Sequence, residues 1–372
     1  MKIKFYMRKI IGMALSTLGG VHLLVFLKGS VMGGRKVNTM EELAEVSGIS
    51  RPTLSKYFNN PESVRESTRG KIKMALERYD YRPNIFAINQ NRKLTKTIGI
   101  VVPYSADPFF AEIVRMIERR CIDAGFWPLV FSSHGQQDLE NNALATLQSL
   151  RPAGALIAPL GRSSDVESVQ SFAEEVPTIV FDSNVNVGQA FVGSDNSQSM
   201  ALIVNYLCRT GEPPCFFEMP PVNPNANKRR DAYIKTMQDL GHDPMVVQVN
   251  GSGWDFERIG LKEGARLIGE RKLPSETILC SNDRLAVGLI AAAYKNDIKV
   301  GYGEGCSLRI AGHDDHPWSQ FTCPPLTTVA QDYSSIAEQS VELLFDIING
   351  GLQTKDRPEV LFEGKLIMRE SA

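Results

Sequence analysis

Between Thr97 and the C-terminus, short apolar segments alternate with stretches of helical periodicity, and no other feature limits the fold as strongly. Residues 97–103 (TIGIVVP) are apolar without interruption, as in a strand buried on both faces. The next stretch places Phe110, Ile113 and Ile117 on one helical face. Strands and helices that alternate with short loops form parallel sheets through right-handed crossovers. One sheet does not comfortably hold all the predicted strands, so we predict two α/β subdomains, with further strands at ALIAP, TIVFD, PCFFEM, MVVQV, TILCSN and LRIAGHDD.

Residues 35–83 have a different pattern, that of three short helices. Thr39 and Glu42 have the spacing of a capping box that opens the first helix, and Gly48 ends that helix in a tight left-handed turn. Ser50 is placed to cap the second helix, and a third apolar helix follows. Two short helices joined by a glycine turn, with a third helix packed behind them, predict an all-α helix-turn-helix headpiece.

Charge is distributed unevenly, although the formal net charge of the whole chain is only −1. Residues 35–96 hold thirteen basic and seven acidic side chains, whereas residues 97–372 hold twenty-three basic and thirty-five acidic ones. A compact basic module joined to an acidic body indicates a polyanionic partner for the module alone, and nucleic acid is the leading candidate. The six cysteines have no metal-finger spacing and are predicted to be reduced thiols.

Residues 1–34 have the outline of a signal peptide or a weak membrane anchor. Five basic residues flank an apolar stretch from Ile10 to Leu27, but polar and glycine residues interrupt it and no small-x-small cleavage site follows. A start at Met32 with the upstream codons translated in error is the favoured interpretation, because export would separate a DNA-binding module from its DNA. Membrane anchoring with a cytoplasmic headpiece is kept as a minor alternative.

At SGISRPTLSKYFNN (47–60), followed by YRPN (81–84), the sequence resembles the LacI/GalR family of bacterial transcription regulators. The resemblance extends over about 37–370, and DPFF, the end of TIVFD, ILCSNDRLAVG, IAGHDD and PPLTTVAQD follow in family order. It implies a headpiece, a hinge and a periplasmic-binding-protein-like sensor, and a homodimer on a pseudo-palindromic operator. The predicted boundaries are 35–83 for the headpiece, 84–96 for the hinge and 97–372 for the sensor, with subdomain one at about 97–193 and 332–358 and subdomain two at about 194–331 and 359–372.

The exposed first turn of the second helix is the predicted base-reading element. Arg51 suits bidentate recognition of guanine, whereas Pro52 can contribute only shape or a methyl contact. By the family's register, Lys56 stands where a basic residue commonly contacts bases. The competing interpretation of both basic residues is solvated surface charge. The predicted DNA contacts are Arg51, Pro52, Thr53, Ser55, Lys56, Asn59, Asn84, Ala87 and Gln90.

The hinge departs from the family's pattern. Members of the family place PNxxAxxL here, and the leucine wedges into the minor groove, whereas this chain has PNIFAINQNRK with Gln90 at the wedge position. Asn84 and Ala87 match the pattern. Either Gln90 hydrogen-bonds to minor-groove acceptors, or Ile88 takes the apolar role after a shift of register, so a strong kink is not predicted.

Ligands of such a sensor lie between the subdomains, at the C-terminal ends of the strands. Aspartate and arginine there suit sugar hydroxyls, and aromatic rings stack on the sugar face. The competing interpretation of Asp107 and Asp283 is helix capping, because each precedes a predicted helix. Several carboxylates with one arginine suit a sugar or polyol better than an anion. The predicted ligand contacts are Asp107, Phe109, Phe110, Asp182, Arg229, Trp254, Asp283 and Asp314.

These features predict a cytoplasmic, nucleoid-associated and ligand-responsive repressor of carbohydrate or polyol genes. A homodimer is expected, and a tetramer is left open. Catalysis, a cofactor and a metal site are not predicted; the His313–His316 segment leaves a strand without assured metal-ligand geometry. The alternatives are an exported periplasmic sugar-binding protein, which the headpiece speaks against, and an α/β sugar-processing enzyme, for which the sequence offers no catalytic pair.

Overall fold

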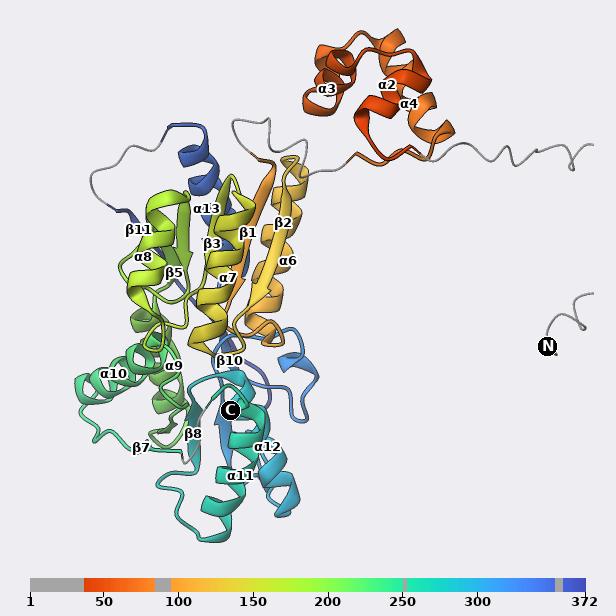
Figure 1. The fold of residues 1–372 in the computed structure, drawn as a ribbon. Helices are drawn as coiled ribbons and strands as arrows, with labels where there is room; N and C mark the ends of the chain where they lie inside the picture. The colour runs from red at the N-terminus through yellow and green to blue at the C-terminus, as the bar shows by residue number, and fades with distance from the viewer. Residues whose placement is uncertain (1–36, 84–94, 250–252, 352–356) are drawn as a thin grey trace, which may run out of the picture. The chain divides into compact units, whose positions relative to one another are not determined.

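The computed structural model describes residues 37–83, 95–249, 253–351 and 357–372 (Figure 1). These residues fall into two compact units, the first from 37–83 and the second from residue 95 onward. The apolar extension at 1–34 lies outside the described residues. So does the hinge as far as residue 94, with Asn84, Ala87 and Gln90.

The first unit is the predicted helix-turn-helix. The capping box is present, because Thr39 Oγ1 accepts from the Glu42 amide at 3.1 Å and the Glu42 carboxylate accepts from the Thr39 amide at 3.4 Å. Gly48 ends the first helix at φ +67°, and Ser50 caps the second by accepting from the Thr53 amide. The elements are α2 (Met40–Ser47), α3 (Arg51–Asn59), a 3-10 turn η1 (Pro61–Ser63) and α4 (Glu66–Arg78).

A small apolar core joins the three helices of this unit. Leu43, Leu54 and Ile72, one from each helix, are completely buried. The Tyr79 hydroxyl donates to the Val46 carbonyl oxygen at 3.0 Å and fixes the end of α4 against α2. The core therefore holds α3 by its inner face and leaves its outer face exposed.

The first subdomain of the second unit has a parallel six-stranded sheet in the order β11-β5-β4-β3-β1-β2. Its inner strands are buried on both faces because helices cover both sides: α6 (Pro108–Asp123) and α13 (Tyr333–Ile348) on one, α7 (Gln137–Leu150) and α8 (Val166–Glu175) on the other. The strands are β1 (Thr97–Val102), β2 (Trp127–Ser132), β3 (Gly154–Ile157), β4 (Thr178–Phe181), β5 (Ala190–Ser194) and β11 (Glu359–Phe362).

The second subdomain repeats this arrangement on a smaller scale, as a parallel sheet in the order β7-β6-β8-β9. Its helices again pack on both faces, in pairs: α9 (Asn196–Thr210) with α10 (Pro224–Asp239), and α11 (Phe256–Gly269) with α12 (Asp283–Lys295). The strands are β6 (Cys215–Phe217), β7 (Val246–Val247), β8 (Thr277–Cys280) and β9 (Arg309–Ala311). The two parallel-sheet subdomains predicted from the sequence are thus present.

The chain passes between the subdomains near β10 (Thr328–Ala330), which pairs antiparallel with β12 (Lys365–Ile367), after a 3-10 turn η2 (Ser319–Phe321). One predicted boundary needs correction: residues 359–362, assigned to subdomain two, form β11 and pair in parallel with β5 of the first sheet. This edge strand alternates exposed and half-buried residues, so it lacks the continuous apolar run that marks the inner strands. Within the described ranges, every helix is too short or too polar to cross a membrane.

Candidate functional site

A pocket lies within the second unit, where residues following the strands of the two sheets meet. Both subdomains contribute to its wall. Seven of the eight predicted ligand residues line it: Asp107, Phe109, Phe110, Asp182, Arg229, Trp254 and Asp314. The pocket is therefore where the strand-end rule for open α/β sheets places it.

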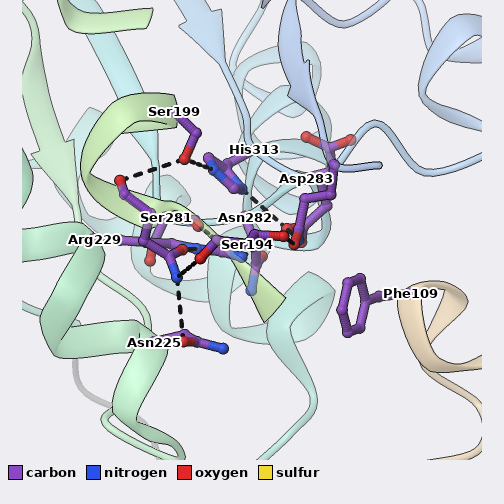
Figure 2. Close-up of polar contacts among 12 residues, drawn as sticks. Phe109, Ser194, Ser199, Asn225, Arg229, Ser281, Asn282, Asp283 and His313 are labelled. Atoms are coloured by element: carbon purple, nitrogen blue, oxygen red, sulfur yellow. Dashed lines mark hydrogen bonds and ion pairs between the residues drawn. The ribbon is translucent and has the colours of Figure 1, made fainter. Parts of the chain in front are cut away.

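Arg229, on α10, is the centre of the polar wall of this pocket (Figure 2). Its buried guanidinium donates from Nε to Asn196 Oδ1 at 2.9 Å, from Nη1 to the Ser281 carbonyl oxygen at 2.8 Å and from Nη2 to Asp314 Oδ1 at 2.9 Å. A guanidinium has five N–H donors, so each terminal nitrogen keeps one more. Arg229 is thus oriented before any ligand is present.

The Asp314 carboxylate oxygen Oδ1 has three hydrogen-bond partners. Besides Arg229, its Oδ1 accepts from Gln331 Nε2 at 2.6 Å and contacts His313 Nδ1 at 3.0 Å. Burial opposes ionisation of Asp314, but Arg229 and the His313 hydrogen bond outweigh it and hold the pKa of the carboxyl well below its usual value. Burial, followed by the Arg229 charge, lowers the pKa of His313 to about 4, so its ring is neutral. Asp314 therefore stays ionised as the partner of Arg229.

Asp182, at the end of β4, is held differently. Asn225 Nδ2 donates to its Oδ1 at 2.9 Å, and Asn225 Oδ1 accepts in turn from Asn196 Nδ2 at 3.2 Å. Burial raises the pKa of Asp182 to about 7, and the Arg229 charge offsets only part of this effect. Asp182 and Asp314 both have positive φ angles, +60° and +127°, where L-residues are rarely found. Such backbone strain concentrates at binding sites.

Asp107 caps α6, as the capping interpretation held: its Oδ1 accepts from the Phe109 amide at 2.9 Å. It also accepts at Oδ2 from Arg284 Nη1 of α12 at 2.9 Å. Arg284 also donates to the Glu257 carboxylate, from Nε to Oε1 at 2.7 Å and from Nη2 to Oε2 at 2.6 Å. An ion pair therefore links the first subdomain to the second beside the pocket, through a residue, Arg284, that the sequence analysis did not single out.

Asp283, the eighth predicted ligand residue, does not line the pocket. Its carboxylate is fully buried and accepts from the His316 amide at 3.0 Å and from the Ser319 and Thr328 hydroxyls at 2.6 Å each. The predicted cap is also one residue off, because Asn282 is the N-cap of α12 and accepts from the Leu285 amide at 2.8 Å. The Asp283 side chain therefore points into the protein interior, whereas the neighbouring Asn282 side chain lines the pocket.

Aromatic side chains form another part of the pocket lining, and Figure 2 shows the Phe109 ring standing apart from the Arg229 hydrogen bonds. The Trp254 ring stacks on Tyr104 at 6.4 Å between ring centres and also packs on Phe110 and Phe256. Six further residues line the pocket but were not predicted from the sequence: Met219, Asn223, Asn225, Phe256, Asn282 and Gln331. Gln331 directly follows β10, so the strand-end rule could have found it; Asn225 in α10 carries no comparable signal.

The exposed side of α3 is the second candidate surface. Arg51, Pro52, Lys56 and Asn59 are exposed, while Thr53 and Ser55 are half-buried. Arg51 Nε lies 2.6 Å from a Glu41 carboxylate oxygen in a solvent-exposed ion pair, a type of contact that contributes little to stability. The predicted base-reading side chains of this helix thus lie on one accessible face, opposite the buried Leu54.

Two family models match the chain. Residues 39–84 match the bacterial regulatory proteins of the lacI family, and residues 206–372 match a periplasmic binding protein-like domain. Among curated relatives, the ribose operon repressor of Escherichia coli K12 is 27% identical over 309 residues, covering 82% of this chain and 92% of the relative. The PurR repressor of Haemophilus influenzae strain PittEE is 26% identical, covering 90% of this chain and 98% of the relative.

Solved structures share the fold. A lac repressor dimer bound to operator and the anti-inducer ONPF superimposes with a TM-score of 0.77 at 22% identity, over 91% of this chain and 99% of that chain. A complex of the transcriptional regulator CelR with cellobiose gives a TM-score of 0.62 at 20% identity, over 90% of this chain and 99% of that chain.

Proposed function

We infer that this chain, a member of the lacI family of bacterial regulatory proteins, is a sequence-specific DNA-binding transcription regulator controlled by a small ligand. One observation carries the sensor half of this inference: a buried arginine, fixed by three hydrogen bonds, and several aromatic side chains line one pocket formed by both subdomains. Such a pocket combines an apolar wall with a few converging polar groups, as small-molecule sites do.

The regulator we propose is a cytoplasmic repressor of carbohydrate or polyol genes that binds a pseudo-palindromic operator as a homodimer. Its headpiece spans 35–83, its hinge 84–96 and its sensor 97–372. Named relatives support the class of effector, since one is a ribose operon repressor and a structural neighbour is a complex with cellobiose. The DNA contacts are those predicted on α3 and in the hinge, and the ligand contacts are the pocket-lining residues.

Coupling between the two sites follows from the position of the pocket. A ligand that contacts both subdomains favours one of their relative arrangements, and it shifts operator affinity only if it binds the two arrangements with different affinity. Whether the ligand releases DNA or promotes binding depends on which arrangement it prefers. By thermodynamic linkage, operator DNA must change ligand affinity by the same factor.

Genomic selection followed by footprinting with the full chain tests the DNA half. A sequence-specific regulator protects discrete symmetric sites, and the genes beside them report the pathway. Protection of no site at low salt, with and without metabolites, would refute the proposal. Recovery of the chain from the periplasm would instead favour an exported sugar-binding protein.

Thermal-shift and mobility-shift titrations with a panel of sugars and polyols test the sensor half. Arg229→Met should abolish the response, whereas Arg230→Met, a matched change one residue along α10, should not. Because Arg229→Met leaves Asp314 as a buried unpaired charge, Asn225→Ala serves as a second pocket variant whose loss of response does not depend on that pair. An unchanged response in both pocket variants would contradict the site.

A further inference from the structure

Of the three aspartates that line the pocket, two form ion pairs and one does not. Asp314 is paired with Arg229 and Asp107 with Arg284, each at 2.9 Å. Asp182 makes no ion pair with any of the described residues; its carboxylate accepts from the Asn225 amide at 2.9 Å and the Ser183 hydroxyl at 3.2 Å. One buried carboxylate on the pocket wall is therefore held only by neutral donors.

Arg229 is the cation that acts on Asp182, but it is engaged with Asp314, and the buried His316 ring also lies beside Asp314, at 3.6 Å. Arg284 is already shared between Asp107 and Glu257. The pKa of His313 is lowered to about 4 by its burial, so that ring is neutral at physiological pH. The buried carboxylate of Asp283, next to the pocket, is likewise held by neutral donors. Desolvating a carboxylate without a counter-charge is costly, so a ligand that supplies one gains affinity.

The aromatic wall also suits a positive charge. Phe109, Phe110, Trp254 and Phe256 line the pocket, and the face of an aromatic ring attracts cations. The Arg284 guanidinium already lies 5.0 Å from the centre of the Phe256 ring, so this wall accepts a cation in the present structure. An anionic ligand would face the same rings and the unpaired carboxylate with no free cation except the remaining N–H groups of Arg229.

We propose that the effector is a protonated amine of sugar or polyol size, such as an amino sugar or amino alditol, whose ammonium group pairs with Asp182. Its hydroxyls accept from the free N–H groups of Arg229 and bind the neighbouring amides, while the carbon ring packs on the aromatic wall. A neutral sugar hydroxyl can satisfy one oxygen of Asp182 but leaves the charge uncompensated. The inference rests on the proposed function, because it concerns the chemistry of the same pocket.

Matched ligand pairs test the amine directly. The full chain is titrated calorimetrically with hexosamines carrying the amine at different ring positions, with amino alditols, and with the hydroxyl parent of each. The charge-assisted bond should make at least one amine bind about tenfold or more tightly than its parent. Asp182→Asn should remove that preference, whereas Asp231→Asn, an exposed change on α10, should leave it intact.

Proton release is a second readout that a merely structural role of Asp182 would not produce. Burial raises the pKa of this carboxyl to about 7; the nearby Arg229 charge lowers the pKa, and the Asp314 and Asp107 charges raise it. Pairing with an ammonium requires the ionised form, so binding near neutral pH should release roughly half a proton. Titration in two buffers of different ionisation enthalpy measures this number, and Asp182→Asn should abolish the release.

Two results would overturn the inference. Hydroxyl parents that bind as tightly as their amines in every pair would show a pocket for neutral sugars and leave the proposed regulator intact. Absence of binding by every amine at millimolar concentration would equally refute it. Failure of the proposed function is distinguishable, because it appears as no operator binding and no response to any sugar, polyol or amine.

Discussion

Asp182→Asn should stabilise the ligand-free protein in a manner that depends on pH. The change is isosteric, and the Asn225 amide that donates to Oδ1 at 2.9 Å keeps an acceptor, so charge is the main difference. The pKa of Asp182 is raised from 3.8 to about 7, chiefly by burial. Between these values the native state binds a proton that the unfolded chain has released, so the free energy of unfolding falls as pH rises through this window. At 1.36 kcal/mol per pKa unit, the full cost above the native pKa is about 4 kcal/mol.

Urea unfolding of wild type, Asp182→Asn and the exposed control Asp231→Asn, from about pH 4 to about pH 8, measures the effect. All other titrating groups are common to the proteins and cancel in the difference. The variant should match wild type at the acid end, gain steadily, and exceed it by about 4 kcal/mol at the alkaline end, while the control stays flat. A difference that is independent of pH, or that favours wild type at the alkaline end, would refute the assignment of Asp182 as a buried uncompensated carboxyl.

Three further changes are predicted. Arg284→Met should lower the free energy of unfolding of the sensor by about 3–5 kcal/mol in urea, because it leaves Asp107 buried without its partner. Adding Asp107→Asn should recover part of that loss, and strictly additive effects of the two changes would argue against the pair. Arg51→Ala should weaken discrimination at one operator position by about tenfold or more with little change in salt slope; a uniform loss across sequences would mean a phosphate contact. Gly48→Ala should destabilise the headpiece by roughly 1 kcal/mol because φ is +67°, as hydrogen exchange in α2 can measure; unchanged protection would contradict this.

Local features were predictable because neighbours in sequence decide them. The capping box of Thr39 and Glu42, the left-handed turn at Gly48 and the Ser50 cap each depend on residues at most four positions apart, and the structure contains them as predicted. The buried face of α6 followed in the same way from a period of 3.6 residues. Because parallel strands bring their C-terminal ends to one edge, the positions of most pocket residues also followed from the strand pattern.

Which side chains pair with one another across the fold depended on tertiary structure. Arg284 pairs with Asp107 across 177 residues of sequence, and Asn225 reaches Asp182 across 43. Asp283 shows the limit most clearly: a one-residue difference in helical phase turns its carboxylate into the loop after β9 rather than the pocket. Sequence periodicity thus determined which segments form strands and helices and which ends meet. Only the packed fold decided which carboxylates form ion pairs and which one, Asp182, is held by neutral donors alone, because burial and distance in space set those energies.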